Sequence, residues 1–231
     1  MANKAKPDAR PRPFDPESWL PWLNVMSTRV RISYRMLAEL HTFTEHSIKV
    51  RTAEINAAKT DSSRDWNEEE LFGDYHAEEL EQLENFKREA SLPHTVALYH
   101  LLENELKVIF KWRFTGLPDN KQKDNLIWSV HTWKGLKNLT QTYFQFDVAS
   151  VADFRVVDEL RCIANSVKHT QGRVNKELNL LTRWPHNKPI DVANVDLTRL
   201  REACVSFFSD FAQKAERAIN EKFGNPAKAR K

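Results

Sequence analysis

Apolar residues recur every three or four positions along most of this chain, and this spacing is typical of amphipathic helices rather than strands. Residues 24–59 contain no proline or glycine and carry two apolar stripes, so they predict one long helix with two partly buried faces. The first stripe comprises Val30, Tyr34, Leu37, His41, Thr44, Ile48 and Ile55. The second comprises Ile32, Met36, Leu40, Phe43 and Val50.

The later segments repeat this pattern. Residues 67–90 predict an acidic helix, residues 126–144 an aromatic one, and Asp196 is expected to cap a strongly amphipathic final helix. Ser91 is expected to cap a further helix, with Pro93 in its first turn. The chain is therefore predicted to be all-α, a single up-and-down bundle of about five to seven helices over residues 19–224. A basic proline-rich arm, residues 1–18, and a basic tail, residues 225–231, are expected to be mobile.

Residues 153–172 predict one helix with a core side and a polar side. The core side comprises Leu160, Ile163, Ala164 and Val167. The adjoining face gathers Arg161, Asn165, Lys168 and His169, because residues four apart lie one turn above another. Ser150 and Asp153 resemble a capping box before the helix, and Gly172 stands where a left-handed cap would end it.

Charge is distributed unevenly along the chain. The net charge of +3 does not by itself indicate nucleic acid. Residues 65–89 are strongly acidic, whereas residues 161–188 are mostly basic, with Glu177 as their only carboxylate. The glutamates of the acidic stretch favour a solvated face, or a protein-docking surface, over a di-iron site, because no Glu-x-x-His pair accompanies them. This charge distribution permits an anionic partner at the basic end. It also permits a contact between the acidic and basic surfaces of the protein itself.

Several functional classes are excluded by missing patterns. The chain has only 5 glycines and lacks a P-loop, Cys-x-x-Cys, His-Glu-x-x-His and Gly-x-Ser-x-Gly, so we predict no cofactor and no metal. Cys162 and Cys204 are expected to be buried free thiols, and the seven residues between Cys162 and His169 argue against a nucleophile–base pair. No apolar run approaches a membrane span, and the basic start has no apolar core, so a cytoplasmic protein is expected.

The polar face of residues 153–172 suits the chemistry of RNA cleavage. Histidine can accept the proton of a 2′-hydroxyl near neutral pH, and arginine or lysine can stabilise the charged phosphorane. Glu105 interrupts an apolar face and is expected to pair with Arg161 or Lys168, mainly as a structural ion pair and also as an orienting group. For His41, a core histidine is favoured over a site residue. For the aromatic residues of 126–144, core packing is favoured over stacking on RNA bases.

These residues also resemble a known family. Arg161 followed by Asn165-Ser-Val-Lys168-His169, then Gly172 and Glu177-Leu178, in an all-α chain, resembles the HEPN superfamily. The resemblance implies a compact and often dimeric helical bundle, and a metal-independent ribonuclease of toxin–antitoxin or phage-defence systems. It implies Arg161 as the phosphate-binding cation, Asn165 as the polar residue and His169 as the catalytic base. The sequence departs from the family's Arg-x4–6-His spacing, because Arg161 lies eight positions before His169. Lys168 is therefore the alternative cation.

Two functions remain open at this point. The first is a metal-independent endoribonuclease, or an RNA-binding effector, acting in bacterial stress or phage defence as a homodimer. The second is a non-catalytic interaction protein, an antitoxin or adaptor, that docks a basic partner on its acidic residues 65–89. A third reading is that the polar face of residues 153–172 only packs against the last helix.

Overall fold

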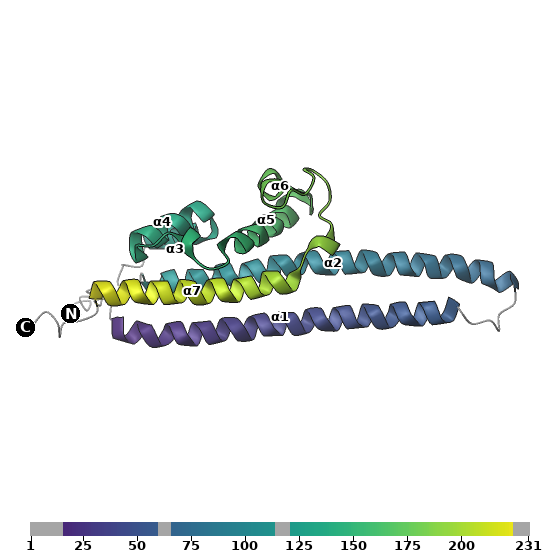
Figure 1. Cartoon of the computed structure of the whole chain (residues 1–231), viewed down its shortest axis with the longest axis horizontal. Helices are drawn as coiled ribbons and strands as arrows, with labels where there is room; N and C mark the ends of the chain where they lie inside the picture. The colour runs from purple at the N-terminus through teal and green to yellow at the C-terminus, as the bar shows by residue number, and fades with distance from the viewer. Residues whose placement is uncertain (1–15, 60–65, 114–120, 224–231) are drawn as a thin grey trace, which may run out of the picture. The chain divides into compact units, whose positions relative to one another are not determined.

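The computed structural model describes residues 16–59, 66–113 and 121–223, which form helices joined by short loops, with no strand among them. Seven α-helices are described: α1 (Pro16–Lys59), α2 (Trp66–Arg113), α3 (Lys121–Trp128), α4 (Trp133–Phe144), α5 (Phe154–Thr170), α6 (Lys176–Thr182) and α7 (Leu197–Phe223) (Figure 1). The prediction of an all-α chain with five to seven helices is confirmed. Residues 1–15 of the expected arm, and the expected tail, lie outside the described residues.

The chain divides into two compact units. The first unit takes residues 1–30, 101–154 and 206–231, and the second takes residues 31–100 and 155–205. Helices α1, α2 and α7 each contribute to both units.

In the second unit, α1 and α2 form an antiparallel hairpin (Figure 1). The Tyr34 hydroxyl donates to the Leu98 carbonyl at 3.0 Å, and farther along α1 the Arg51 Nε donates to Glu79 Oε1 at 2.7 Å. Contacts therefore advance along α1 while they retreat along α2, as in an αα-hairpin. The first predicted stripe of α1 is buried at Val30, Tyr34, Ile48 and Ile55 and half-buried at Leu37, His41 and Thr44.

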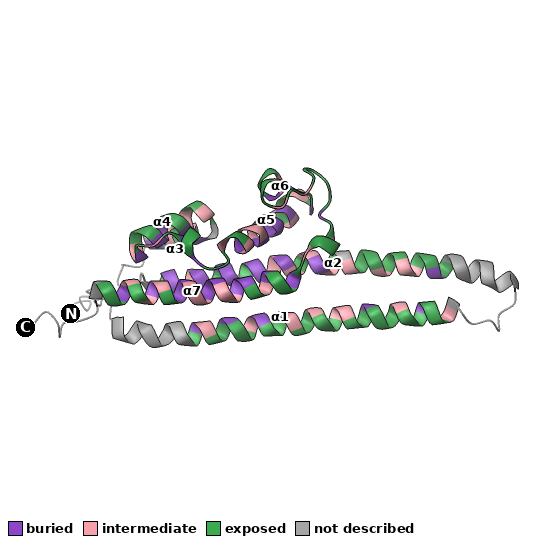
Figure 2. Cartoon of the chain, viewed as in Figure 1, coloured by how far each residue is buried: buried purple, intermediate pink, exposed green. Residues whose placement is uncertain are grey.

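The second predicted stripe of α1 is not buried. Its five apolar residues stay exposed, at Ile32 55%, Met36 65%, Leu40 54%, Phe43 68% and Val50 43%. The exposed colour follows much of α1 in Figure 2. The expectation of two partly buried faces is wrong, because helical spacing defines an apolar face without supplying an element to cover it.

Helix α2 also differs from the prediction, because it continues without a break through Pro93. The expected cap, Ser91, instead donates its hydroxyl back to the Lys87 carbonyl at 2.8 Å. His94 Nδ1 bonds the Ala90 carbonyl at 2.7 Å, and the Thr95 hydroxyl donates to the Leu92 carbonyl at 2.6 Å. These side chains satisfy carbonyls around the proline, whose missing N–H removes one backbone bond without ending the helix.

Aromatic side chains form much of the core of the first unit. Phe110 lies 5.3 Å from Phe144 and 6.3 Å from Phe211, ring centre to ring centre, and all three are fully buried. Core packing of the aromatic segment is confirmed for Phe144, whereas Trp128 of the same segment is 66% exposed. The single helix expected over residues 126–144 is interrupted, however, by a 3₁₀ turn at Ser129–His131, after which Thr132 caps α4 by accepting from Gly135 N at 3.0 Å.

Local signals set the ends of the last three helices. Gly172 follows α5 with φ of 73°, as expected of a left-handed cap, and its N–H donates to the Ser166 carbonyl at 3.0 Å. Asp196 caps α7 by accepting from Arg199 N at 2.9 Å, and Asn175 caps α6 by accepting from Leu178 N at 2.8 Å. The capping box expected from Ser150 and Asp153 is absent here, because the Ser150 hydroxyl donates to Asp147 O and Asp153 has φ of 54°.

We predict that Gly135→Ala destabilises the protein, because a β-carbon at this position would lie 2.8 Å from the Ser129 carbonyl carbon and closer still to its oxygen. The expected loss in free energy of unfolding is about 1–3 kcal/mol, the usual cost of overpacking. Urea denaturation followed by circular dichroism measures it, with Asn138→Ala, at an exposed position of α4, as the control. Equal stability of the Gly135→Ala and Asn138→Ala proteins would contradict this packing.

Candidate nucleic-acid interface

Helix α5 presents the polar face predicted from the sequence. Leu160 and Ile163 are fully buried on its core side. On the other side Arg161 and Asn165 are half-buried, whereas Lys168 and His169 are exposed in its last turn. The exposure of these four side chains therefore increases toward the C-terminal end of α5.

Arg161 is held by two carboxylates. Its Nε donates to Asp158 Oδ1 at 2.8 Å, its Nη2 donates to Glu177 Oε2 at 3.0 Å, and 13% of its side chain is exposed. Burial opposes the charge, but Cys162, Asp158 and Glu177 together raise the pKa of Arg161 above its ordinary value. The guanidinium is thus a permanent cation that joins α5 to α6. The carboxylates of Asp158 and Glu177 already balance its charge within the protein.

Cys162 lies beneath this ion pair. It is fully buried, its sulfur accepts from Arg161 Nη2 at 3.2 Å, and burial raises the pKa of its thiol to about 12. The thiolate needed by a nucleophile is therefore scarce at neutral pH. This environment supports the interpretation of Cys162 as a structural thiol.

Lys168 and His169 face solvent. The Lys168 ammonium lies 5.7 Å from the ring centre of Tyr99, a cation–π contact that orients the lysine without neutralising it. Within the described part of the chain, no hydrogen bond or ion pair engages the His169 ring. Its nitrogens are therefore open to a ligand, and Asn165 lies one turn before it on the same helix.

Basic side chains continue beyond α5. We call the exposed residues Lys168, His169, Arg173, Lys176, Arg183, His186 and Lys188 the basic surface. Backbone pairing closes the segment: Val174 N donates to the Lys188 carbonyl at 2.8 Å, and Arg173 forms an isolated bridge with Pro189. Arg173 and Lys188 are thereby brought together although fifteen positions separate them in the sequence.

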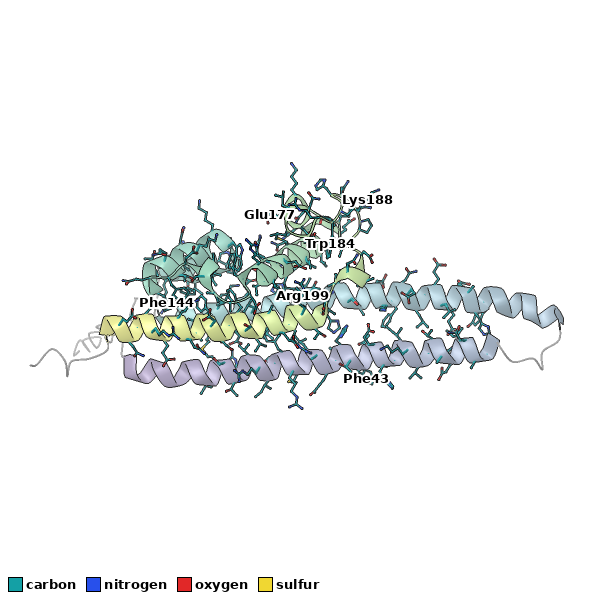
Figure 3. All side chains as sticks on the ribbon, viewed as in Figure 1. Phe43, Phe144, Glu177, Trp184, Lys188 and Arg199 are labelled. Atoms are coloured by element: carbon teal, nitrogen blue, oxygen red, sulfur yellow. The ribbon has the colours of Figure 1, made fainter. Side chains whose placement is uncertain are left out.

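The basic surface contains one carboxylate between residues 168 and 188, Glu177, and Arg161 holds it. Figure 3 shows Glu177, Trp184 and Lys188 in the segment around α6. Leu180 is 69% and Leu181 43% exposed, and Trp184 is half-buried beside them in sequence. Exposed cations interleaved with apolar and aromatic side chains are the composition of surfaces that bind single-stranded nucleic acid. The basic stretch of residues 161–188 could be found from the sequence. The way this stretch folds back on itself depends on backbone hydrogen bonds, which the pattern of charged and apolar positions does not predict.

Glu105 belongs to the other unit and has a different partner from those expected. Its Oε1 accepts from Arg29 Nε at 3.1 Å and from Arg29 Nη2 at 2.5 Å, while its Oε2 is buried without a hydrogen bond among the described residues. Glu105 is 4% exposed, so Arg29 supplies the charge partner that burial requires. Its expected contact with Arg161 or Lys168 stays a prediction.

A separate small pocket, with a cavity volume of about 20 Å³, gathers groups that the sequence did not bring together. His41 of α1, His94 of α2 and Arg201 of α7 line it, with leucines forming much of the remaining wall. The two imidazole rings meet edge to face, with ring centres 5.5 Å apart. Arg201 was missed as a functional residue, because its helix position alone gives no sign that two histidines lie beside it.

Comparison with protein-family models, curated proteins and solved structures found no match to this chain. None of the described helices combines the length and apolar character needed to cross a membrane. No three histidine, cysteine, aspartate or glutamate side chains of the described ranges cluster as metal ligands do.

Both cysteines are predicted to be unreactive in the folded protein, because burial raises the pKa of each thiol to about 12. At pH 8 a disulfide reagent such as DTNB should modify them at least about 100-fold more slowly than free cysteine, since the thiolate is the nucleophile. The same reagent in 8 M urea gives the full count of two thiols as the control. Rapid modification of Cys162 in the native state would contradict the burial of this residue.

Proposed function

We propose that this chain is an RNA-binding protein that cleaves RNA without a metal, with His169 as the general base. The observation that carries the proposal is the basic surface, which presents an unengaged His169 beside Lys168 and has its one carboxylate tied to Arg161. Such a surface attracts the phosphate backbone, and its imidazole can act at the 2′-hydroxyl. The HEPN resemblance extends the proposal to a homodimeric effector of bacterial stress or phage defence, working in the cytoplasm.

The proposed reaction is an internal transesterification. His169 takes the proton of the 2′-hydroxyl, the 2′-oxygen bonds to the adjacent phosphorus, and the bond from phosphorus to the 5′-oxygen breaks. The leaving 5′-oxygen takes a proton from water or from the imidazolium. The products are a 2′,3′-cyclic phosphate and a 5′-hydroxyl, so no redox partner or further reactant is needed.

The roles of the cations follow from their partners. Lys168 is exposed and carries no carboxylate partner among the described residues, so it is the group that stabilises the pentacovalent phosphorane. Arg161 acts as a positioning residue in this proposal, because its hydrogen bonds fix Glu177 and hold α6 against α5. Asn165, one turn before His169, is placed to bind the phosphate or a base.

We predict that the protein cleaves single-stranded RNA in EDTA and that His169→Ala lowers the rate about 100-fold or more, the usual contribution of a general base. His186→Ala is the matched control, because His186 is an exposed histidine of the same basic surface but lies outside α5. Gel analysis of a labelled RNA measures the rate, and circular dichroism checks the fold. Equal cleavage by the His169→Ala and wild-type proteins would remove His169 from the reaction.

Binding is measured separately from cleavage, by fluorescence anisotropy on RNA with 2′-deoxy substitutions. Replacement of Arg183 and Lys188 by glutamine should weaken binding of every RNA sequence and reduce the salt slope by about one for each lost phosphate contact. Unchanged binding and salt slope would show that the basic surface is not the RNA interface.

A second candidate function is that of an interaction protein, and the exposed stripe of α1 favours it. Roughly half of each of its five side chains lies in water, which gives on the order of 400–600 Å² of apolar surface, as large as the largest patches of typical monomers. The flanking hydroxyls of Thr42 and Ser47 donate to the Ala38 and Phe43 carbonyls of the same helix at 2.9 Å. The flanks can therefore be covered without leaving these hydroxyls unsatisfied.

A second copy of the chain fits this stripe. Ile32 and Val50 are equally far in sequence from residue 41, and Leu40 and Phe43 lie at the centre. An antiparallel two-fold pair centred on residue 41 would place Ile32 against the partner's Val50 and would gather Leu40 and Phe43 of both copies at the axis, as an isologous interface requires. With its flanks, such a pair approaches the about 800 Å² per partner of a standard interface.

The acidic residues 65–89 remain a proposed docking surface for a basic partner. Among its described side chains, Glu78, Glu81, Glu84 and Glu89 are exposed, whereas Glu79 is bound by Arg51. Phe86, 54% exposed, adds an apolar contact between them. This surface favours an adaptor or antitoxin role if the RNA activity fails.

The α1 dimer predicts that the wild-type protein sediments as a dimer at micromolar concentration and that Phe43→Glu converts it to a monomer, because a charge would be buried at the centre of the interface. Lys49→Glu, at an exposed position of α1 outside the stripe and its flanks, should leave the dimer intact. Analytical ultracentrifugation measures the three proteins. A monomeric wild type, or a dimeric Phe43→Glu protein, would contradict the α1 interface.

A further inference from the structure

The pocket between α1, α2 and the start of α7 carries an unsatisfied imidazole nitrogen. His94 Nδ1 lies 2.7 Å from the Ala90 carbonyl, so Nδ1 bears the hydrogen and the neutral ring presents a lone pair at Nε2. That Nε2 atom is buried and has no hydrogen-bond partner among the described residues. Buried polar atoms are rarely left in this state, so the pocket calls for a group that can bond to Nε2.

The charges around the pocket favour an anion. Arg201 contributes a guanidinium whose side chain is 29% exposed, and its recorded ion pair, to Glu202, is long at 3.9 Å. The one carboxylate recorded against the histidines is Glu45, whose Oε1 lies 3.9 Å from His41 Nε2. One arginine and two imidazoles thus face this space against two carboxylates, Glu45 and Glu202, each 3.9 Å from its partner; Glu202 is 71% exposed, so solvent screens its charge.

The protonation state of the histidines is coupled to this charge. Burial lowers the pKa of His41, the nearby His94 and Arg201 lower it further, and Glu45 opposes the shift. Burial therefore disfavours the charged form of the His41 imidazole. A bound anion would offset the repulsion from Arg201 and favour the protonated imidazoles.

We propose that this pocket binds a small oxyanion of the phosphate or sulfate type, free or as the terminal group of a small ester. Arg201 provides planar N–H donors for the oxygens, and His94 Nε2 becomes a donor when the ring is protonated. The Thr198 hydroxyl lines the same space, and Leu37, Leu98 and Leu197 supply an apolar wall for the rest of an ester. The site shares no residue with the basic surface, so it is independent of the proposed RNA cleavage.

Proton linkage gives the site a testable pH dependence. Anion binding stabilises the charged imidazole of His41 and so raises its pKa, which means that affinity increases as pH falls through the histidine range. The increase is expected to be about tenfold between pH 7.5 and pH 5.5, the effect of one linked proton with a pKa raised by about one unit. Sulfate is the appropriate probe, because its own charge stays constant over this range.

The experiment follows the imidazole C–H signals of the full-length protein by NMR during titration with sodium sulfate, against sodium chloride at equal ionic strength. The signals of His41 and His94 should shift with sulfate and saturate at lower concentration at pH 5.5, while the exposed His46 should not respond. Inorganic phosphate and methyl phosphate, compared at pH 5.5, distinguish a free anion from an ester. Unmoved His41 and His94 signals in 50 mM sulfate would overturn the proposal.

Two arginine variants test the guanidinium. Arg201→Gln should weaken sulfate binding at least about tenfold. Arg199→Gln, two residues earlier on α7 and bound to Glu159, should leave it unchanged. Equal affinity of the Arg201→Gln and wild-type proteins would also overturn the site. His169→Ala should retain sulfate binding, so failure of the RNA proposal and failure of the pocket give different results.

Discussion

The ion pairs of Arg161 connect α5 to α6 beneath the basic surface, which is the proposed RNA interface. Asp158 and Glu177 lie on successive helices, and the guanidinium between them is mostly covered. Without Arg161, Glu177 would face the basic surface as an unpaired carboxylate and would repel phosphate. With it, the surface from Lys168 to Lys188 carries positive charge without a competing free carboxylate among its residues. A residue expected to bind phosphate directly is thus assigned an organising role.

The second unit combines surfaces with different physical character. The basic surface suits a polyanion, the α1 stripe suits an apolar partner, and the histidine pocket suits a small anion. The stripe and the pocket lie on different sides of α1, because Phe43 belongs to the exposed stripe and His41 to the buried one. One helix therefore carries both the exposed stripe and part of the pocket wall. The proposed dimer and the proposed anion site can be tested separately, by substitutions on different sides of α1.

Much of the fold could be predicted from local signals in the sequence. Asp196 caps a helix with its own side chain, and Gly172 ends one through its positive φ, so both helix ends can be predicted from the sequence. The predicted start of a new helix at Ser91 and Pro93 was wrong. The side chains of Ser91, His94 and Thr95 satisfy carbonyls within α2, an effect that intrinsic helix propensity does not include. The exposed stripe was predicted as an apolar face, but periodicity does not say whether another element covers it. Arg161, Lys168 and His169 were found from the sequence because they share one helix, whereas Arg201 joins His41 and His94 only after three helices have packed.

The central claim is that His169 on the basic surface promotes attack by the RNA 2′-hydroxyl without a metal. The most direct measurement is the chemical nature of the RNA ends formed in EDTA by the purified protein, determined by mass spectrometry of the fragments. The account predicts fragments that end in a 2′,3′-cyclic phosphate and begin with a 5′-hydroxyl, because the attacking oxygen comes from the RNA itself. Fragments with a 3′-hydroxyl and a 5′-phosphate, which require attack by water, would contradict it.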